Sequence, residues 1–378
     1  MDRYLVLNAG SSTLKASVVE PGRRAALAGT TVDWGSDATR AADRRRSVER
    51  ALADLGEPAA SLSGVGHRVV HGGERFVHPV MLDEAVLAEL DGLAELAPLH
   101  NPIALETARA AMALLPGVAH VAAFDTAFHA SLPEEAVVYP LPWEWHVERG
   151  IRRFGFHGLS VEWALRRATE LLGRPAAELA LVVAHLGSGC SVTAVDGGRS
   201  VATSMGYTPL EGLMMGTRAG SVDPGVLLWA LRGGALGADR LAEVLDHESG
   251  LLGVSGVSGD VRQVAAAADA GDRRAALALD MFVRRTAEGI GAAAVALPRL
   301  DGLVFTGGIG ENAAALRGRI IERLPVLGVA PIAADETGTD RLLSEPGSTP
   351  AVLRVESRED LVIADAVAAI APREPRRE

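Results

Sequence analysis

Short blocks of apolar residues near the amino terminus are separated by turn residues. Residues 4–10, YLVLNAG, form an apolar run that ends in turn formers, and residues 12–22, STLKASVVEPG, resume the run before a Pro-Gly stop. Apolar runs separated by a Gly/Ser turn predict two strands joined by a tight connection. We therefore expect a β-hairpin with a polar turn at the start of the chain.

A second hairpin with the same pattern is predicted at residues 181–198, LVVAHLGSGCSVTAVDGG. With Gly187 aligned to Gly10, the identical pairs are Ser188 with Ser11, Val183 with Val6 and Val195 with Val18. The same element at the expected start of each half indicates a duplicated domain.

Between and after the hairpins, apolar residues recur every three or four positions, which is the period of an amphipathic helix. Helices are expected over residues 83–100, 102–115, 238–249, 261–271 and 272–297. Residues 120–129 predict a buried strand that runs into a turn, and residues 302–312 a strand that breaks into a glycine turn. Because strands alternate with helices, the expected fold class is α/β with largely covered sheets.

Length and composition narrow the class of protein further. A chain of 378 residues, 48% of them hydrophobic, exceeds what one core usually serves, so two domains are expected. The formal net charge of −11 argues against nucleic acid or an anionic membrane as the main partner. The basic run at residues 44–46 lies in a polar helical stretch and is interpreted as a solvated helix face.

The compartment is indicated by cysteine content and by the amino terminus. One cysteine, Cys190, excludes an internal disulfide framework and favours a reducing compartment. The apolar run before Asn8 is too short for a signal peptide, and no uncharged apolar stretch reaches the ~18 residues of a membrane span. We expect a cytoplasmic protein that binds neither a membrane nor nucleic acid.

Three Gly/Ser-rich turns that follow predicted strands are candidate phosphate-binding loops. They are NAGSST at 8–13, HLGSG at 185–189 and TGGIGEN at 306–312. Such turns present backbone N–H groups without side-chain bulk, which suits phosphate oxygens. Lys15, the only lysine of the chain, follows the first turn and is either a phosphate contact or an ordinary surface residue.

A second group of residues suits a small anion. Arg68 lies on an apolar strand that ends in Gly-Gly, His100 lies between two prolines in PLHNP, and His157 lies beside aromatic residues. Arg218 comes near the end of a long glycine-rich loop at 204–224, and loops of that length are usually functional. Because the planar guanidinium binds carboxylates and phosphoryl groups, Arg68 and Arg218 are candidates to bracket two reacting anions.

Nine segments together resemble the acetate kinase family, in order and over nearly the whole chain. They are LVLNAGSSTLK, GHRVVHGGE, PLHNP, FDTAFH, GIRRFGFHG, HLGSG, TSMGYTPLEGLMMGTR, SGLLGVSGVSGD and FTGGIGEN. The resemblance implies two duplicated ribonuclease-H-like (actin-like ATPase) domains with a central nucleotide cleft, and a homodimer. The expected domains are residues 1–148, completed by a C-terminal helix at 362–378, and residues 149–361.

The resemblance also implies roles for individual residues. Asp125, His157 and Arg218 are expected to be catalytic. Arg68 is expected to bind the carboxylate of the acid, and Asn8 and Glu359 to be associated with Mg²⁺, with Mn²⁺ as an alternative. The expected ATP or ADP contacts are Lys15, Ser11, His185, Leu186, Gly187, Ser188, Gly189, Asp260, Val261, Arg262, Gly308, Ile309, Gly310, Glu311 and Asn312.

The expected acyl site comprises Val70, Leu99, His100, Phe156 and Pro209. Val70, rather than a smaller residue, favours acetate over propionate, although one methylene is worth only about 1 to 3 kcal/mol. The chain departs from the family pattern at Ser188, where asparagine is usual, at Ser221, where an acid is usual, and at Arg358, where asparagine is usual. Residues 20–60 also form a shorter stretch than the family pattern has at this place.

The predicted function is reversible, Mg²⁺-dependent phosphoryl transfer from ATP to acetate by direct in-line displacement. A carboxylate acceptor is ionised at neutral pH and needs no general base, so Asp125 is expected to orient other groups or to organise the metal shell. Three alternatives remain at this point: a kinase for propionate or another short acid, a phosphohydrolase of the same fold, and an actin-like assembly protein.

Overall fold

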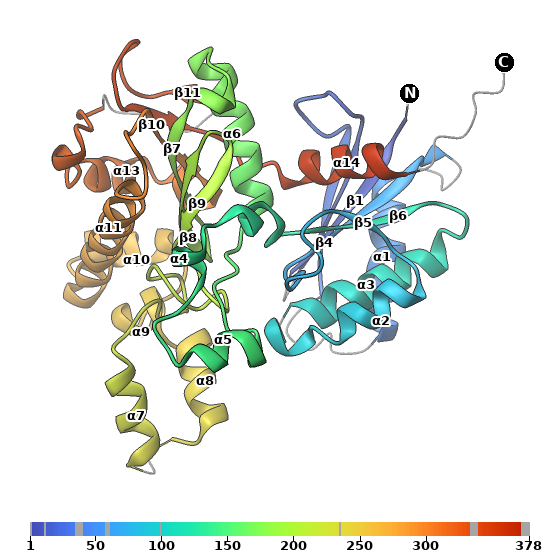
Figure 1. Ribbon diagram of the computed structural model, residues 1–378, viewed down its shortest axis with the longest axis horizontal. Coiled ribbons are helices and arrows are strands. Elements are labelled where there is room, and N and C mark those ends of the chain that lie inside the picture. Colours follow the sequence, from blue (N-terminus) through green and yellow to red (C-terminus); the bar gives the residue numbers. More distant parts are fainter. Residues whose placement is uncertain are drawn as a thin grey trace. The chain divides into compact units, whose positions relative to one another are not determined.

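The computed structural model describes residues 2–10, 13–34, 41–56, 61–98, 100–233, 236–332 and 339–371 (Figure 1). Two of the predicted site residues, Ser11 and Leu99, lie outside these ranges. The chain divides into two compact units. The first holds the residues up to Ala130 and those from Arg358 onward, and the second holds Ser131–Ser357.

The first unit contains a six-stranded sheet in the order β3-β2-β1-β4-β6-β5. Its strands are β1 Tyr4–Ala9, β2 Thr13–Val19, β3 Ala28–Asp33, β4 Gly64–Val69, β5 Val80–Met81 and β6 His120–Phe124. Strands β1 and β2 form the antiparallel hairpin that the sequence predicts, whereas β1, β4 and β6 run parallel. The carboxyl ends of β1, β4 and β6 therefore meet at one edge of the sheet.

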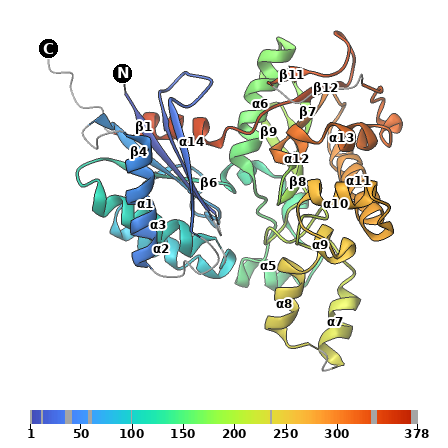
Figure 2. The same cartoon turned by 180° about the vertical axis from the view of Figure 1, so that it is seen from behind.

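Helices cover both faces of this sheet (Figures 1 and 2). Helices α1 Ala41–Leu55 and α3 Asn101–Leu114 pack on one face, with α2 Glu84–Asp91 against α3, and α14 Glu359–Ile370 packs on the other. Glycines in β4 permit the close approach of α14. A Cβ on Gly66 would lie 2.3 Å from Cγ2 of Ile363. This packing holds the start of α14 beside the sheet.

The second unit repeats the strand order of the first. Its sheet runs β11-β12-β10-β7-β8-β9, so that β7, β8, β9, β10 and β12 take the places of β1, β2, β3, β4 and β6. The strands are β7 Ala180–Leu186, β8 Cys190–Asp196, β9 Arg199–Thr203, β10 Gly302–Thr306, β11 Arg341–Leu342 and β12 Ala351–Arg354. Both predicted hairpins and the α/β class with duplicated ribonuclease-H-like sheets are confirmed.

Helices α6 Gly158–Leu172 and α11 Arg273–Ala294 cover opposite faces of the second sheet (Figures 1 and 2). The other α-helices of this unit are α4 Glu134–Val137, α5 Trp143–Arg149, α7 Pro224–Arg232, α8 Ala238–His247, α9 Gly250–Ser255, α10 Val261–Asp269, α12 Gly307–Asn312 and α13 Ala314–Ile321. Short 3₁₀ helices span Ala94–Leu96, Ala127–Ser131, Ala176–Glu178 and Pro325–Leu327. Within the described ranges, none of the helices has the length and apolar composition needed to cross a membrane.

Most predicted elements are found, with two differences in extent. The helix expected over 83–100 ends at Asp91, because glycine at position 92 is a poor helix former and a 3₁₀ turn follows. The glycine turn expected after β10 is instead the short helix α12, which starts at Gly307 with a φ of 78°. The long loop at 204–223 has no regular structure, as predicted.

The basic run at 44–46 was expected to form a solvated helix face, and this holds for only two of its three arginines. It lies on α1, and Arg45 and Arg46 are exposed, but Arg44 is buried. The Arg44 guanidinium lies 4.1 Å from the centroid of the Trp34 ring, and Nε lies 3.8 Å from Glu106 Oε2. Burial lowers the pKa of Arg44, although Glu106 opposes the shift. The helix therefore presents only part of the basic run to solvent.

A buried pair of histidines in the first unit predicts a dependence of stability on pH. His67 Nε2 lies 2.9 Å from His120 Nδ1, and the two rings stack. Burial lowers the pKa of His120 to about 4 and that of His67 well below its usual value. Because folding lowers both pKa values, this part of the stability is complete above about pH 6.5 and is lost as the pH falls toward 4.

We expect the free energy of unfolding to fall below pH 6.5 by up to about 1.4 kcal/mol per pH unit for each histidine. Urea unfolding between pH 7.5 and 5 measures it. The substitution His120→Gln is expected to reduce the slope, whereas His247→Gln, at an exposed position on α8, is the control. If the free energy of unfolding depended equally on pH in the unmodified protein and in both variants, the assignment of this dependence to the buried histidine pair would be contradicted.

Candidate active site

Four polar residues meet at the carboxyl-end edge of the first sheet. Arg68 on β4 donates from Nε to Asp125 Oδ1 (2.9 Å) and from Nη2 to Asp125 Oδ2. Its Nη1 donates to Asn8 Oδ1 on β1 (3.2 Å). Asn8 Nδ2 in turn donates to Glu359 Oε2 (3.0 Å), which lies 3.5 Å from Arg68 Nε. We call these four residues the Arg68 cluster.

The electrostatics of the Arg68 cluster favour a charged, oriented guanidinium. Burial by itself lowers the pKa of Arg68, but the carboxylates of Asp125 and Glu359 outweigh it, so the pKa is raised. The Asp125 side chain is 1% exposed and that of Arg68 is 17% exposed. Of the five N–H groups of Arg68, these hydrogen bonds use three. One N–H on each Nη thus has no partner among the described residues.

Glu359 is the first residue of α14, where a carboxylate is favoured by the helix dipole. The neighbouring Arg358 is held by other groups of the first unit. The Arg358 guanidinium donates from Nε and Nη2 to the two carboxylate oxygens of Asp360, both at 2.9 Å, and from Nη1 to Arg24 O. Asp360 thus holds the Arg358 guanidinium at the start of α14.

The other described residues of the first unit that were predicted for the site lie on the strands of the same sheet, just after them, or at the start of a helix that packs on them. Lys15 on β2 is exposed and pairs directly opposite Asn8, so both side chains project from the same face of the hairpin. Val70 is buried just after β4, and His100 precedes α3 at its N-cap. Lys15 therefore lies in the first unit, whereas the other described residues predicted to bind nucleotide lie in the second.

His157 and Arg218 face the same glycine of the second unit. A Cβ on Gly189 would lie 3.3 Å from His157 Nε2 and 3.6 Å from Arg218 Nη1. His157 has a φ of 60°, the only non-glycine residue with a positive φ among the described positions. Strained backbone of this kind is concentrated at functional sites. Glycine at 189 keeps the space between the two side chains open.

Arg218 is held within the long loop by oxygens on two sides. Its Nη1 donates to Pro209 O (3.4 Å), and its Nε lies 3.8 Å from Asp246 Oδ1. Burial lowers the pKa of Arg218, and Asp246 opposes that shift, so the guanidinium remains charged at neutral pH. The predicted Phe156 is buried and directly precedes His157.

The predicted nucleotide residues of the second unit lie around the turn at 187–189. His185 and Leu186 end β7, and a Cβ on Gly187 would lie 3.6 Å from His185 Nε2 and 4.0 Å from Gly308 N. Gly216 N donates to Ser188 O (3.2 Å), and a Cβ on Gly216 would lie 2.9 Å from Gly259 O. The loop before Asp260 and the start of α12 are thus brought to the same turn.

Some of these residues have structural contacts that the sequence did not suggest. The Asp260 carboxylate caps α10 and pairs with Arg262, which lowers the pKa of Asp260. Glu311 Oε1 accepts from Ser357 N (2.9 Å), and burial raises the pKa of Glu311. Asn312 Nδ2 donates to Gly308 O (2.9 Å). Val261 begins α10, and Ile309 and Gly310 lie within α12.

Within the described residues, no group of three or more His, Cys, Asp or Glu side chains is arranged to hold a metal ion by itself. The predicted ligands Asn8 and Glu359 are nevertheless adjacent: Asn8 Nδ2 donates to Glu359 Oε2 and Asn8 Oδ1 accepts from Arg68 Nη1, so the Glu359 carboxylate is the oxygen group that this pair offers to a metal ion. Mg²⁺ is commonly bound through one or two carboxylates together with substrate phosphates. The donor set therefore fits a metal ion that arrives with a nucleotide.

Four residues of the site, three of them buried, were not singled out from the sequence. Asn101 exchanges hydrogen bonds with the backbone of His71 after β4. Ser191 contacts His157, and Ser160 contacts both His185 and Ser357. No local pattern in the sequence marks the serines, because their partners are distant in the chain.

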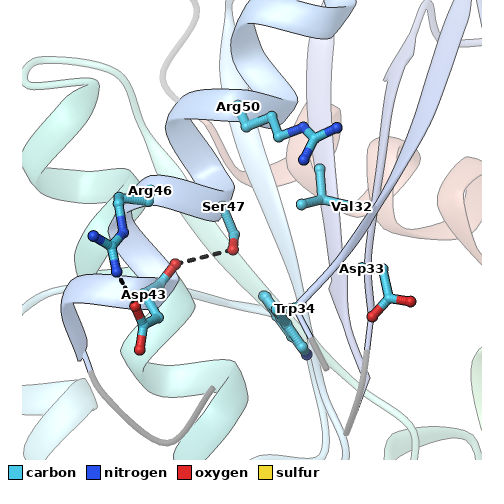
Figure 3. Close-up of a pocket in the computed structure, with 7 residues that line it drawn as sticks. All are labelled: Val32, Asp33, Trp34, Asp43, Arg46, Ser47 and Arg50. Atoms are coloured by element: carbon cyan, nitrogen blue, oxygen red, sulfur yellow. Dashed lines mark hydrogen bonds and ion pairs between the residues drawn. The ribbon is translucent and has the colours of Figure 1, made fainter. Parts of the chain in front are cut away.

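One further pocket lies in the first unit, between β3 and α1 (Figure 3). It is lined by Val32, Asp33, Trp34, Asp43, Arg46, Ser47 and Arg50. Arg46 pairs with Asp43, and Ser47 Oγ donates to Asp43 O (2.9 Å). None of its lining residues belongs to the predicted site.

The family model, the curated relatives and the solved structures that match this chain all indicate the same family. The model of the acetokinase family matches residues 3–365. An acetate kinase from Synechococcus sp. is 50% identical over 310 residues, which cover 82% of this chain and 76% of the relative. The crystal structure of Porphyromonas gingivalis acetate kinase has a TM-score of 0.88 at 34% identity and covers 98% and 100% of the two chains. A propionate kinase from Francisella tularensis has a TM-score of 0.89 at 33% identity, with the same coverage.

Proposed function

The chain belongs to the acetokinase family, and on that premise we propose that it is an acetate kinase. The reaction is the reversible transfer of the γ-phosphoryl group of ATP to acetate, which gives acetyl phosphate and ADP by direct in-line displacement. The observation that carries this proposal is Arg68. Two of its N–H groups have no partner among the described residues, while Asp125 and Asn8 hold the rest of the guanidinium.

We assign acetate to Arg68 and to the apolar residues Val70, Leu99, Phe156 and Pro209, with His100 as a further contact. A planar guanidinium with an N–H on each Nη suits a carboxylate. Acetate is ionised at neutral pH, so it attacks phosphorus without losing a proton. Asp125, whose two oxygens accept from Arg68, acts by orienting the guanidinium.

We assign the phosphate groups of ATP to the glycine turn at 187–189 and the residues around it, and we assign Lys15 to the nucleotide as well. In phosphoryl transfer the protein mainly positions the reactants and neutralises charge on the equatorial oxygens. His157 Nε2 and Arg218 Nη1, which both face Gly189, suit that role. When bound, Mg²⁺ would be held by Glu359 and Asn8 and would neutralise charge on the phosphates.

The test is trapping of acyl phosphate as its hydroxamate with MgATP and acetate, propionate or butyrate. We expect the most product with acetate and roughly tenfold less with propionate, because one methylene discriminates weakly. The similarity to a propionate kinase makes preference for propionate the second candidate. Phosphate release from ATP without any acid, and no acyl phosphate with any of the three, would instead indicate a phosphohydrolase.

We also propose that the protein is a homodimer through α7. Val226, Leu228, Trp229 and Leu231 of this nine-residue helix are 55%, 47%, 73% and 40% exposed. Such a concentration of exposed apolar side chains is unusual for a monomer and typical of an interface between copies.

The substitution Trp229→Glu is expected to convert the dimer to a monomer of 39.3 kDa in light scattering coupled to gel filtration. A charge at the centre of an apolar interface has to be buried without a partner. Val295→Glu is the control, because Val295 lies at the end of α11 and is 83% exposed. A monomeric unmodified protein, or a dimer that survives Trp229→Glu, would contradict the proposal.

We place the reaction in the cytoplasm. ATP and short carboxylic acids are cytoplasmic metabolites of the class that this site suits.

The single thiol, Cys190, is buried, and burial raises its pKa to about 12, so it is kept in the unreactive protonated form.

A further inference from the structure

Two buried serines bind the two stacked histidines of the second unit in a crossed arrangement. The rings of His157 and His185 lie 4.1 Å apart at their centroids. Ser160, in the first turn of α6, places Oγ 2.8 Å from His185 Nδ1, and Ser191, on β8, places Oγ 3.0 Å from His157 Nδ1. Because His157 precedes α6 and His185 pairs with Ser191 across the β7–β8 hairpin, each serine holds the histidine of the other element.

We propose that Ser160 and Ser191 are positioning residues that fix both imidazoles in the tautomer with the proton on Nε2. A neutral imidazole has one N–H and one lone pair, and the bond made by one nitrogen determines the state of the other. A hydroxyl that donates to Nδ1 therefore leaves Nε2 as the N–H donor. The same principle governs the orientation of histidines by outer hydrogen bonds at metal sites.

Both Nε2 atoms face the glycine turn. His157 Nε2 lies beside Gly189 together with Arg218 Nη1, and His185 Nε2 lies beside Gly187, close to the backbone N of Gly308. With both protons on Nε2, every one of these nitrogens is a donor toward the same turn. Phosphate oxygens are acceptors only, so a lone pair at either Nε2 would repel them.

Ser357 extends the hydroxyl chain beyond Ser160. The Ser160 hydroxyl has a single proton and two partners, His185 Nδ1 and Ser357 Oγ, the latter at 3.1 Å. In the assigned direction Ser357 donates to Ser160, and Ser160 donates to His185. The backbone N–H of Ser357 donates to Glu311 Oε1, which keeps Ser357 in place. All three serines therefore contribute to the state of His185 or His157.

The spectroscopic test is ¹⁵N NMR of histidine-labelled protein at neutral pH without substrates, with signals assigned through His157→Gln and His185→Gln. We expect both rings to be neutral with the proton on Nε2. The Nδ1 signal of His185 should move in Ser160→Ala and that of His157 in Ser191→Ala, because each loses its hydrogen-bond donor. In the control Ser131→Ala, whose hydroxyl donates to Ser200 O, neither signal should move. A proton on Nδ1 of either ring, or signals that do not respond to these substitutions, would overturn the proposal.

The kinetic test is a double-mutant cycle. Ser160→Ala is expected to lower kcat about tenfold with little change in the KM for acetate, and to have almost no further effect in the His185→Gln background. Equal effects in both backgrounds would show that Ser160 does not act through His185 and would overturn the proposal. This arm rests on the proposed acetate kinase activity, whereas the NMR arm requires no activity, so the two failures are distinguishable.

Discussion

Replacing Arg218 with alanine is expected to lower kcat for acetyl phosphate formation by about 10³-fold while the protein stays folded. The arginine is assigned to the charge that develops on the transferred phosphoryl group, where a fixed cation contributes more than in water. Arg218 Nη1 donates to Pro209 O at 3.4 Å and Nε lies 3.8 Å from Asp246 Oδ1, distances at which a hydrogen bond or ion pair contributes little to stability.

The measurement is the initial rate of hydroxamate formation with saturating MgATP and acetate, with circular dichroism as the check of folding. Arg284→Ala is the matched control, because Arg284 is an exposed arginine of α11 that pairs with Glu288. A kcat within tenfold of the unmodified protein would remove Arg218 from the catalytic assignment.

The second large effect is expected for Asp125→Asn, which should lower kcat by about 100-fold and raise the KM for acetate. Asparagine has the shape of aspartate but presents an N–H₂ group to one of the two Arg68 donors, so the guanidinium loses its fixed orientation. A displacement of about 1 Å at a reacting group costs about that factor. The fold is expected to persist, because Arg68 keeps Asn8 at 3.2 Å and Glu359 at 3.5 Å.

The same hydroxamate assay over a range of acetate concentrations separates the two parameters. Asp91→Asn is the control, because it removes a carboxylate from an exposed pair with Arg109 in the same unit. Near-normal turnover in Asp125→Asn would show that the orientation of Arg68 does not depend on Asp125.

Local sequence was enough to predict the position of the two hairpins, but not the end of the helix expected over 83–100. A hairpin is specified by residues that are neighbours in the chain, an apolar run, a glycine turn and a second run, so both were predicted at the correct place. The helix pattern continued through Gly92, but helix ends depend on propensity and on packing together, and α2 ended at Asp91.

Burial and pairing could not be read from the sequence. Arg44 and Arg45 are adjacent arginines of one helix, yet only Arg44 is buried against Trp34. The Glu311 carboxylate accepts from Ser357 N, 46 positions along the chain, a contact that the sequence did not indicate. The three serines around the histidines carry no local signature at all, because a hydroxyl becomes informative only when its partner is known.

The sequence by itself determined the α/β class, the duplication and the family, because each depends on periodicity or on motifs that occupy consecutive positions. Only the tertiary structure decided how the candidate groups are joined. Asn8 and Glu359 are 351 positions apart and share a hydrogen bond, since the parallel order of β1, β4 and β6 and the glycines under α14 bring them to one edge of a sheet. The physical reason is that hydrogen bonds and charge pairing act over a few ångströms in space, whatever the separation along the chain.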